Sequence, residues 1–221
     1  MERIKAVTRE IEHLVVGDIG CDHAYTAINA ILSGKASYVY ACDIKKGPLG
    51  RAAYNISKYG LSDKIGLKLG NGLKPLIGTG VLTVIIAGLG GFLTIEILSE
   101  GLDHLPEIKQ LILQPMSEIK KVRIYIHSIG YMIKNEQLVY EGNKFYFILN
   151  CAPGQEPGYS EAEYELGRVL LYNKSDVFKK YIKAEIIKTK AIINRIESES
   201  ANGADTRKHE LTNRLEMLKG V

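Results

Sequence analysis

Short segments made almost wholly of apolar residues alternate with segments of helical spacing over the first 155 residues of the 221-residue chain, and this alternation limits the possible folds more than any other feature. Near-continuous apolar strands are typical of strands buried on both faces, and a helix between successive strands is the connection that parallel strands need. The pattern therefore predicts an α/β fold with helices on both sides of a parallel sheet. Strands are expected at residues 14–18, 38–43, 64–69, 81–87 and 110–114, with helices at 24–33, 47–59 and 92–100.

The pattern changes after residue 130. Residues 131–141 and 144–150 are two further strand segments, joined through Glu141, Gly142 and Asn143. Glycine and asparagine accept the left-handed backbone of a tight hairpin turn. The sheet is therefore expected to end in an antiparallel pair.

A Pro/Gly-rich stretch at residues 152–158 marks the expected boundary between a first domain, residues 1–155, and a second, residues 156–221. In the second domain apolar residues recur at three- and four-residue spacing, with one gap at Thr189, and a shorter stripe follows a break at residues 198–205. This predicts an antiparallel helical hairpin of coiled-coil character. The stripe residues are Phe178, Ile182, Ile186, Ile193 and Ile196, followed by Leu211, Leu215 and Leu218.

Most of the net charge of +4 lies in one segment. Residues 174–195 contain seven basic and two acidic residues, so the rest of the chain is close to neutral. Such a run is usually a solvated helix surface. The alternative is a surface that binds the phosphates of a nucleic acid, for which the candidates are Lys179, Lys180, Lys183, Lys188 and Lys190.

The cysteine content and hydropathy exclude several classes of protein. Three cysteines without C-x-x-C spacing provide neither a disulfide framework nor a cysteine zinc site, and no metal is expected. No apolar run has the length of a membrane span, and the N-terminal residues lack the apolar core of a signal peptide. We therefore expect a cytoplasmic protein without a membrane partner. The sequence leaves the oligomeric state open between a monomer and a weak dimer.

The end of the first strand carries the first candidate site, in the run Val16–Tyr25. The strand ends at Asp18 and turns at Gly20 into a helix, where backbone N–H groups can approach a ligand. The dinucleotide pattern G-x-G-x-x-G is absent, and Asp22 would repel a pyrophosphate. A ligand that carries a sulfonium and an ammonium group is compatible with the carboxylates of Asp18 and Asp22. Together with the terminal hairpin, this favours a Rossmann-like S-adenosylmethionine methyltransferase over a nicotinamide oxidoreductase.

Further candidate cofactor residues follow the second and third strands. Asp43, with Ile44 beside it, is placed to accept the ribose hydroxyls of an adenosine. Asn71 and Gly72 follow the third strand, where Asn71 would face the adenine. Each feature alone is also explained by a solvated acid or a simple turn. Their repetition at successive strand ends favours one shared site.

Two more loops lie at the same sheet edge. Ala87, Gly88 and Leu89 begin a glycine-rich loop after the most apolar strand, and a flat base can lie against such a backbone. We assign Ala87 to the cofactor, and Gly88 and Leu89 to the catalytic pocket. Gln114, which ends the fifth strand, is a further catalytic candidate, although Pro115 is equally explained as a strand terminator.

Several runs together resemble the bacterial TrmK family. They are Asp18–Tyr25, Gly47–Leu49, Asn55-Ile56, Gly60-Leu61, Asn71–Leu73, Ile86–Gly91, Leu111–Pro115, Arg123, Glu136 and Glu141–Tyr146. The resemblance covers nearly the whole chain, including the C-terminal helices. It implies a methyltransferase that uses S-adenosylmethionine to modify N1 of adenine 22 in tRNA. Because the methylated base is cationic, Asp22 is the candidate for stabilising it, and His23 and Tyr25 are candidates for orienting the base, although His23 is also explained as the cap of a packed turn.

The chain departs from the family pattern at several positions, among them Cys21, Leu89 and Met116. Thr26-Ala27 and Phe147 are further departures. Two alternatives therefore remain beside the tRNA methyltransferase: a methyltransferase for another substrate, and a non-catalytic RNA-binding relative with the same fold.

Overall fold

The computed structural model describes residues 1–199 and 204–221, which form two compact units, Met1–Gly158 and Tyr159–Val221. Within these residues no helix is long and apolar enough to cross a bilayer. The described part of the chain also contains no group of three or more His, Cys, Asp or Glu side chains arranged to hold a metal ion.

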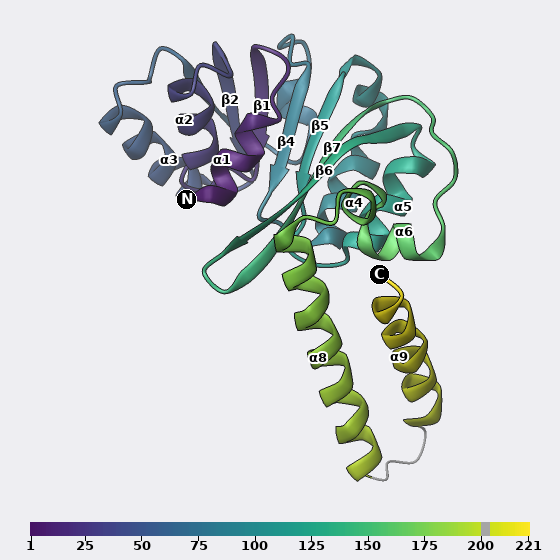
Figure 1. The fold of residues 1–221 in the computed structure, drawn as a ribbon. Helices are drawn as coiled ribbons and strands as arrows, with labels where there is room; N and C mark the ends of the chain where they lie inside the picture. The colour runs from purple at the N-terminus through teal and green to yellow at the C-terminus, as the bar shows by residue number, and fades with distance from the viewer. Residues whose placement is uncertain (200–203) are drawn as a thin grey trace. The chain divides into compact units, whose positions relative to one another are not determined.

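The first unit is built on one seven-stranded mixed sheet (Figure 1). Its order is β3-β2-β1-β4-β5-β7-β6; the first five strands pair in parallel, and β7 pairs antiparallel with both β5 and β6. The predicted parallel sheet with a terminal antiparallel hairpin is therefore confirmed. The strands are β1 (Val15–Ile19), β2 (Tyr38–Asp43), β3 (Ile65–Leu69), β4 (Thr83–Ala87), β5 (Gln110–Gln114), β6 (Tyr131–Glu141) and β7 (Lys144–Pro153).

Helices cover this sheet. Three of them, α1 (Glu2–Arg9), α2 (Tyr25–Leu32) and α3 (Lys46–Lys58), share one core with the central strands. In this core Val7 and Ile28 pack together with Val16, Val39 and Ile85, which are all at most 3% exposed. The remaining helices are α4 (Gly91–Glu100), which packs against α5 (Ile119–Ser128), and the short 3-10 helices η1 (Lys74–Leu76) and η2 (Leu102–Glu107).

The observed elements differ from the predictions at several places, and helix α1 is one that the predicted set of helices lacks. The α5 helix is outside the predicted set, although Val122 and Ile126 on its buried face have helical spacing. The expected linker at residues 152–158 is also partly wrong, because β7 continues to Pro153. Ala152 and Pro153 pair with Met132 and Tyr131 of β6. This pairing with β6 extends β7 past its apolar residues.

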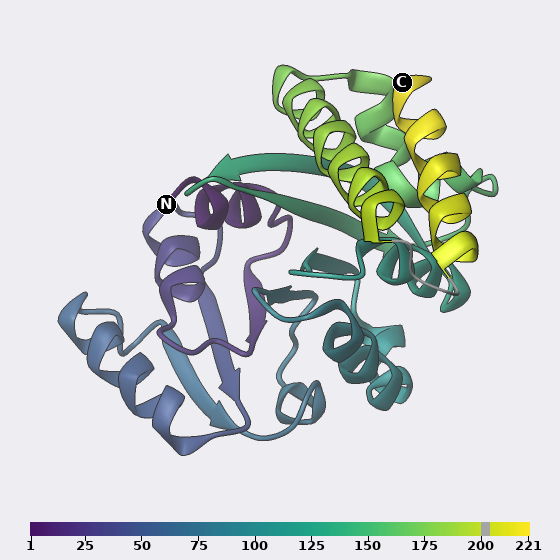
Figure 2. The same ribbon diagram turned by 90° about the horizontal axis from the view of Figure 1, so that it is seen from below.

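The second unit is helical, with α6 (Glu161–Leu166), α7 (Arg168–Asn173), α8 (Asp176–Glu199) and α9 (Ala204–Lys219). The two long helices lie side by side in both views (Figures 1 and 2). Half of the predicted break at residues 198–205, namely residues 200–203, lies outside the described residues; the rest of it is wrong, because α8 continues to Glu199 and α9 begins at Ala204. Of the predicted stripe, Phe178, Ile182, Leu211, Leu215 and Leu218 are buried, whereas Ile186, Ile193 and Ile196 are half-buried.

Thr189 occupies the gap in the apolar spacing of α8 and is only 1% exposed. Its hydroxyl accepts a hydrogen bond from Arg214 Nη1 of α9 at 3.3 Å. The same guanidinium donates to Glu165 of α6 at 2.9 Å and to Glu185 of α8 at 2.8 Å. One side chain therefore joins three helices, and the gap in the apolar stripe is filled by a polar contact.

Candidate active site

Two cavities open at the carboxyl ends of the central strands, on both sides of the loop that follows β1. The first has a volume of about 320 Å³ and lies over β1, β2 and β3. It brings together five of the residues that the sequence predicts for the cofactor: Gly20, Asp43, Ile44, Asn71 and Gly72. The strand order reverses between β1 and β4, and ligands of open α/β sheets bind at such a point.

The second cavity, of about 300 Å³, lies between the end of β1, the end of β4 and helix α1. Its lining includes the predicted catalytic residues His23, Tyr25 and Gly88. Asp18 and Ala87, which the sequence predicts for the cofactor, also line this second cavity rather than the first.

Three residues line both cavities: Gly20, Asp22 and Leu89. Gly20 has a φ of +72°, and a Cβ atom placed there would lie 3.2 Å from Leu89 Cδ1. A larger residue at position 20 would therefore narrow the junction, the place where the two cavities meet. Asp22 and Ala24 also have positive φ values, +38° and +57°, which non-glycine residues adopt at a cost and which are concentrated at functional loops.

Asp22 carries the main charge at the junction. Its carboxylate forms an ion pair with Arg51 of α3, with 2.5 Å between Oδ1 and Nη2, and its other oxygen lies 3.5 Å from His23 Nε2. The His23 ring stacks on Tyr25 with 5.7 Å between ring centroids. Sequence reasoning missed Arg51, although it follows closely after one of the family-like runs, residues 47–49.

Asp18 is buried at 3% exposure, and its Oδ2 atom has no hydrogen-bond partner among the described residues. Burial raises the pKa of this carboxyl to about 7, and a hydrogen bond from the backbone of Ala27 partly opposes the shift. A buried acceptor without a partner costs free energy. The ammonium group of a cofactor that enters the second cavity fits this unsatisfied oxygen.

Gln114 is completely buried and is not part of either cavity lining. Its Oε1 atom accepts a hydrogen bond of 3.1 Å from Arg3 Nη1 of α1. Arg3, not Gln114, therefore reaches the second cavity. No strand-end signal identifies Arg3, because α1 precedes the first strand.

The lysines of α8 lie in the second unit. All five RNA-contact candidates, Lys179, Lys180, Lys183, Lys188 and Lys190, are exposed. Lys179 lies 3.6 Å from Asp176, and Lys188 lies 3.9 Å from Glu185. Both lysine side chains are more than half exposed, and such long pairs stabilise a helix only slightly, so the ammonium groups remain accessible to a polyanion.

The sheet order and the strand-end cavities are those of a Rossmann-like methyltransferase. The ribosomal protein L11 methylase of Lactobacillus delbrueckii shares the fold at 19% identity, with a TM-score of 0.57 over 69% of this chain and 77% of that one. The precorrin-6y C5,15-methyltransferase of Geobacter metallireducens is comparable, with a TM-score of 0.55 over 69% of this chain and 88% of that one, also at 19% identity.

The family model of TrmK, tRNA (adenine(22)-N(1))-methyltransferase, matches residues 16–220. The Bacillus subtilis tRNA (adenine(22)-N(1))-methyltransferase is 32% identical, over 100% of this chain and 95% of its own length. The chain therefore belongs to the TrmK family of S-adenosylmethionine-dependent tRNA methyltransferases.

Two solved relatives contain the cofactor or its product. Streptococcus pneumoniae Sp1610 in complex with S-adenosyl-L-methionine has a TM-score of 0.85 at 29% identity, covering 100% of this chain and 98% of that one. The M. capricolum TrmK in complex with S-adenosyl-homocysteine also has a TM-score of 0.85 at 29% identity, covering 100% of this chain and 96% of that one.

Proposed function

We propose that the chain methylates N1 of adenine 22 in tRNA through the two adjoining cavities of its first unit. The observation that carries this proposal is their shared wall of Gly20, Asp22 and Leu89 in a chain of the TrmK family. When bound, S-adenosylmethionine supplies an electrophilic methyl group on a sulfonium. The shared wall is the place where this methyl group and an acceptor base can meet.

The first cavity is suited to the adenosine of the cofactor. Asp43 ends β2, and its Oδ1 atom accepts a hydrogen bond from the backbone N–H of Lys45 at 2.9 Å, which fixes the carboxylate. We assign the ribose hydroxyls to this carboxylate. Asn71 is held by Glu100 at 2.8 Å, and with Gly72 it forms the wall for the adenine.

The rim of the second cavity is suited to the target adenine. The N1 atom of adenine carries a lone pair at neutral pH, so the residues there need not remove a proton. Their task is to orient the base, an effect worth several powers of ten in rate. The stacked pair His23 and Tyr25 provides a surface for the base, and the Gly88–Leu89 backbone bounds its edge.

Asp22 is assigned to the charge of the product. Methylation at N1 leaves the adenine cationic, and a carboxylate at the junction of the cavities stabilises that charge as it develops. Arg51 holds the carboxylate in place. A target adenine that is paired or stacked in the tRNA must first leave its helix to reach this position.

We further propose that residues 156–221 form a coiled-coil domain whose exposed lysines contact the phosphates of the tRNA. This assignment rests on the concentration of charge in residues 174–195 and on the exposure of the five lysines of α8. A tRNA methyltransferase acts where tRNA is processed, so we infer a cytoplasmic location.

The decisive experiment incubates the purified chain and S-adenosylmethionine with a tRNA that carries adenine at position 22, followed by nucleoside mass spectrometry. We expect N1-methyladenosine, and none in a transcript with guanine at that position. Cofactor binding without tRNA methylation would indicate a methyltransferase for another substrate. Absence of cofactor binding would indicate a non-catalytic relative.

A further inference from the structure

We propose that Phe92 of α4, together with Lys121 of α5, forms a stacking surface for a tRNA nucleotide that adjoins the target adenine. This inference rests on the proposed function, because the nucleotide belongs to the same tRNA. It assigns two residues beside the cavities to the substrate and not to the cofactor.

Phe92 is a large apolar side chain that the fold leaves outside the core. It is the second residue of α4, and 59% of it is exposed. The Lys121 ammonium lies over its ring, with 4.4 Å between Nζ and the ring centroid. A single exposed apolar residue is common on protein surfaces. An aromatic ring next to a lysine, however, provides the two groups that bind single-stranded nucleic acid: a flat surface for a base and a cation for a phosphate.

Phe92 lies close to the shared wall of the two cavities. Leu93, the next residue, lines the first cavity, whereas Gly88 lines the second and Leu89 lines both. Phe92 follows Leu89 by three positions, which span at most about 11 Å even in an extended chain. When a base lies against Leu89, its neighbouring nucleotide is therefore within reach of Phe92.

The loop before Phe92 is fixed by the loop that follows β5. The Leu89 carbonyl accepts a hydrogen bond of 2.8 Å from the Met116 N–H, and the Gly91 N–H donates to the Ser117 hydroxyl at 3.3 Å. A Cβ atom at Gly91 would overlap the Ser117 carbonyl, so only glycine permits this close approach. The ring therefore projects from a defined backbone, which reduces the entropy lost when a ligand binds.

The proposed reaction gives such a surface a task. An adenine that leaves its helix loses its stacking partners, and the nucleotide that remains beside it loses one as well. Any base can stack on an aromatic ring, because every base has a π face. Phe92 thus replaces part of the lost stacking without reading the sequence, and it positions the tRNA while N1 of the target faces the methyl donor.

Lys121 supplies a cation at the same place. Its ammonium lies 2.9 Å from the carboxylate of Glu118, and both side chains are more than one-third exposed. An exposed pair contributes little to stability, so the ammonium can exchange this carboxylate for a phosphate of the stacked nucleotide. The competing occupant is a second copy of this chain. The lysine over the ring disfavours it, because lysine is depleted at the centre of protein–protein interfaces.

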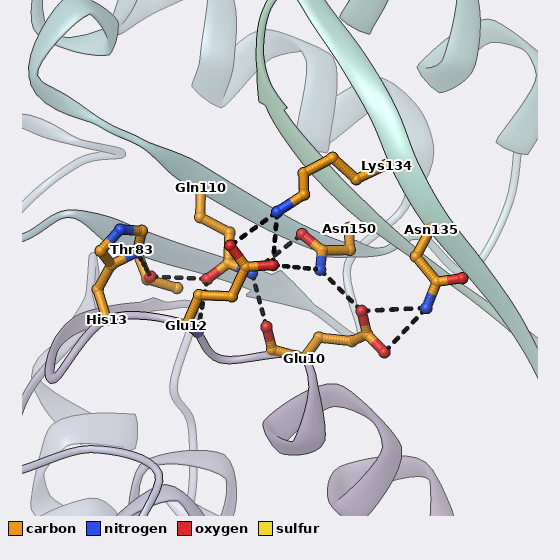
Figure 3. A network of polar contacts seen from close by, with 8 residues as sticks. All are labelled: Glu10, Glu12, His13, Thr83, Gln110, Lys134, Asn135 and Asn150. Atoms are coloured by element: carbon orange, nitrogen blue, oxygen red, sulfur yellow. Dashed lines mark hydrogen bonds and ion pairs between the residues drawn. The ribbon is translucent and has the colours of Figure 1, made fainter.

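A polar network at the opposite edge of the sheet provides a contrast (Figure 3). Thr83 and Gln110 begin β4 and β5, so the network lies at the amino ends of these strands, away from the cavities. Its side chains bind one another: the Thr83 hydroxyl donates to Gln110 at 2.8 Å, and Lys134 pairs with Glu12 at 2.7 Å. Lys134 is therefore a matched control for Lys121, because it is also an exposed lysine paired with a glutamate.

The test is a double-mutant cycle between Phe92 and the nucleotides on both sides of adenine 22. The tRNA is prepared intact, or with an abasic nucleotide directly before or directly after adenine 22, and its affinity is measured by filter binding. Phe92→Leu keeps an apolar side chain and removes the ring. We expect it to weaken binding of intact tRNA by about ten- to a hundredfold, the usual effect of losing one stacked base, and to have little effect on one of the two abasic tRNAs. Phe92→Tyr, which keeps the ring, should bind like the unaltered protein.

Three further variants make the comparison specific. Tyr59→Leu removes an exposed aromatic side chain from the far end of α3 and should leave tRNA binding unchanged. Lys121→Gln should weaken tRNA binding and flatten its slope against log salt concentration by about 0.7–0.9, whereas Lys134→Gln should change neither. Every variant should bind S-adenosylhomocysteine with unaltered affinity in calorimetry, which also shows that it is folded.

Equal losses on the intact and on both abasic tRNAs would overturn the inference, and so would the absence of any loss. A change in the sedimentation of Phe92→Leu without a change in tRNA affinity would assign the ring to a contact between copies. If the unaltered protein methylates adenine 22 and the cycle shows no coupling, only this inference fails. If the unaltered protein does not methylate adenine 22, the proposed function fails.

Discussion

Asp18 shows how strongly burial changes the pKa of a single carboxyl group. Burial raises the pKa of its carboxyl to about 7 from an ordinary value of 3.8. Between these values the folded protein binds more protons than the unfolded chain. The stability contributed by the neutral form is therefore complete below about pH 4 and is lost as pH rises through about 7.

The same shift predicts a pH dependence of cofactor binding. An ammonium group binds the ionised carboxylate, so the affinity for S-adenosylhomocysteine should rise as pH increases through about 7, with release of a proton. Calorimetry in buffers of different ionisation enthalpy measures both effects. Asp18→Asn should bind more weakly and lose this pH dependence. A wild-type affinity that is constant from about one pH unit below to one unit above the pKa of Asp18 would contradict the ammonium assignment.

Asp22 gives a prediction for the chemical step. Asp22→Asn removes the charge and keeps a residue that tolerates the φ of +38°. Cofactor affinity should stay nearly normal, because Asp43 and the strand ends are untouched, while single-turnover methylation of tRNA should slow by about 10²-fold, as expected when transition-state stabilisation is removed. Rates equal to those of the unaltered protein would remove Asp22 from this role.

At the scale of elements, Arg214 is the main polar connection of the helical unit. It binds Glu165 and Glu185, and all three side chains are less than one-third exposed. Arg214→Ala leaves two half-buried carboxylates without their shared cation, and it should destabilise the second unit by about 1–3 kcal/mol. Thermal unfolding followed by circular dichroism measures the effect.

Arg207 on the same helix is the matched control. It forms an i,i+3 pair with Glu210, and both side chains are more than half exposed. Arg207→Ala should change stability by no more than about 0.5 kcal/mol. Equal effects of the two substitutions would show that α9 is held by its apolar stripe alone.

At the scale of the whole molecule, the distribution of charge predicts how tRNA binds. Replacing Lys179, Lys180, Lys183, Lys188 and Lys190 by Gln in the full chain should leave cofactor binding intact and weaken tRNA binding. The slope of log affinity against log salt concentration should flatten by about 0.7–0.9 for each phosphate that the variant no longer neutralises. Filter binding at several salt concentrations provides both quantities.

The control for this experiment changes the net charge by the same amount in the first unit. Its five positions are also exposed: Lys35, Lys58, Lys64, Lys74 and Lys109. If both sets of substitutions weaken tRNA binding equally, net charge alone drives association. In that case the lysines of α8 have no particular role.

The class of fold could be predicted from the sequence, and so could many of the residues that line the two cavities. Strand and helix periodicity depends on residues that are neighbours in the sequence. The predicted first and last residues of β2, β5 and β6 are therefore the ones that the structure shows. Parallel strands place their carboxyl ends at one edge, which is why Gly20, Asp43 and Asn71 could be assigned to one cavity from the strand pattern alone.

Strand order and the contacts between distant segments could not be predicted from the sequence and became visible only in the folded chain. Gln114 and Arg3 are separated by 111 positions in the chain, and only the packing of α1 against the sheet determines that the arginine lines the cavity while the glutamine lies beneath it. The raised pKa of Asp18 likewise depends on burial by residues that surround it in space. Local periodicity carries no information about such contacts, because their energy arises only when the separate elements meet.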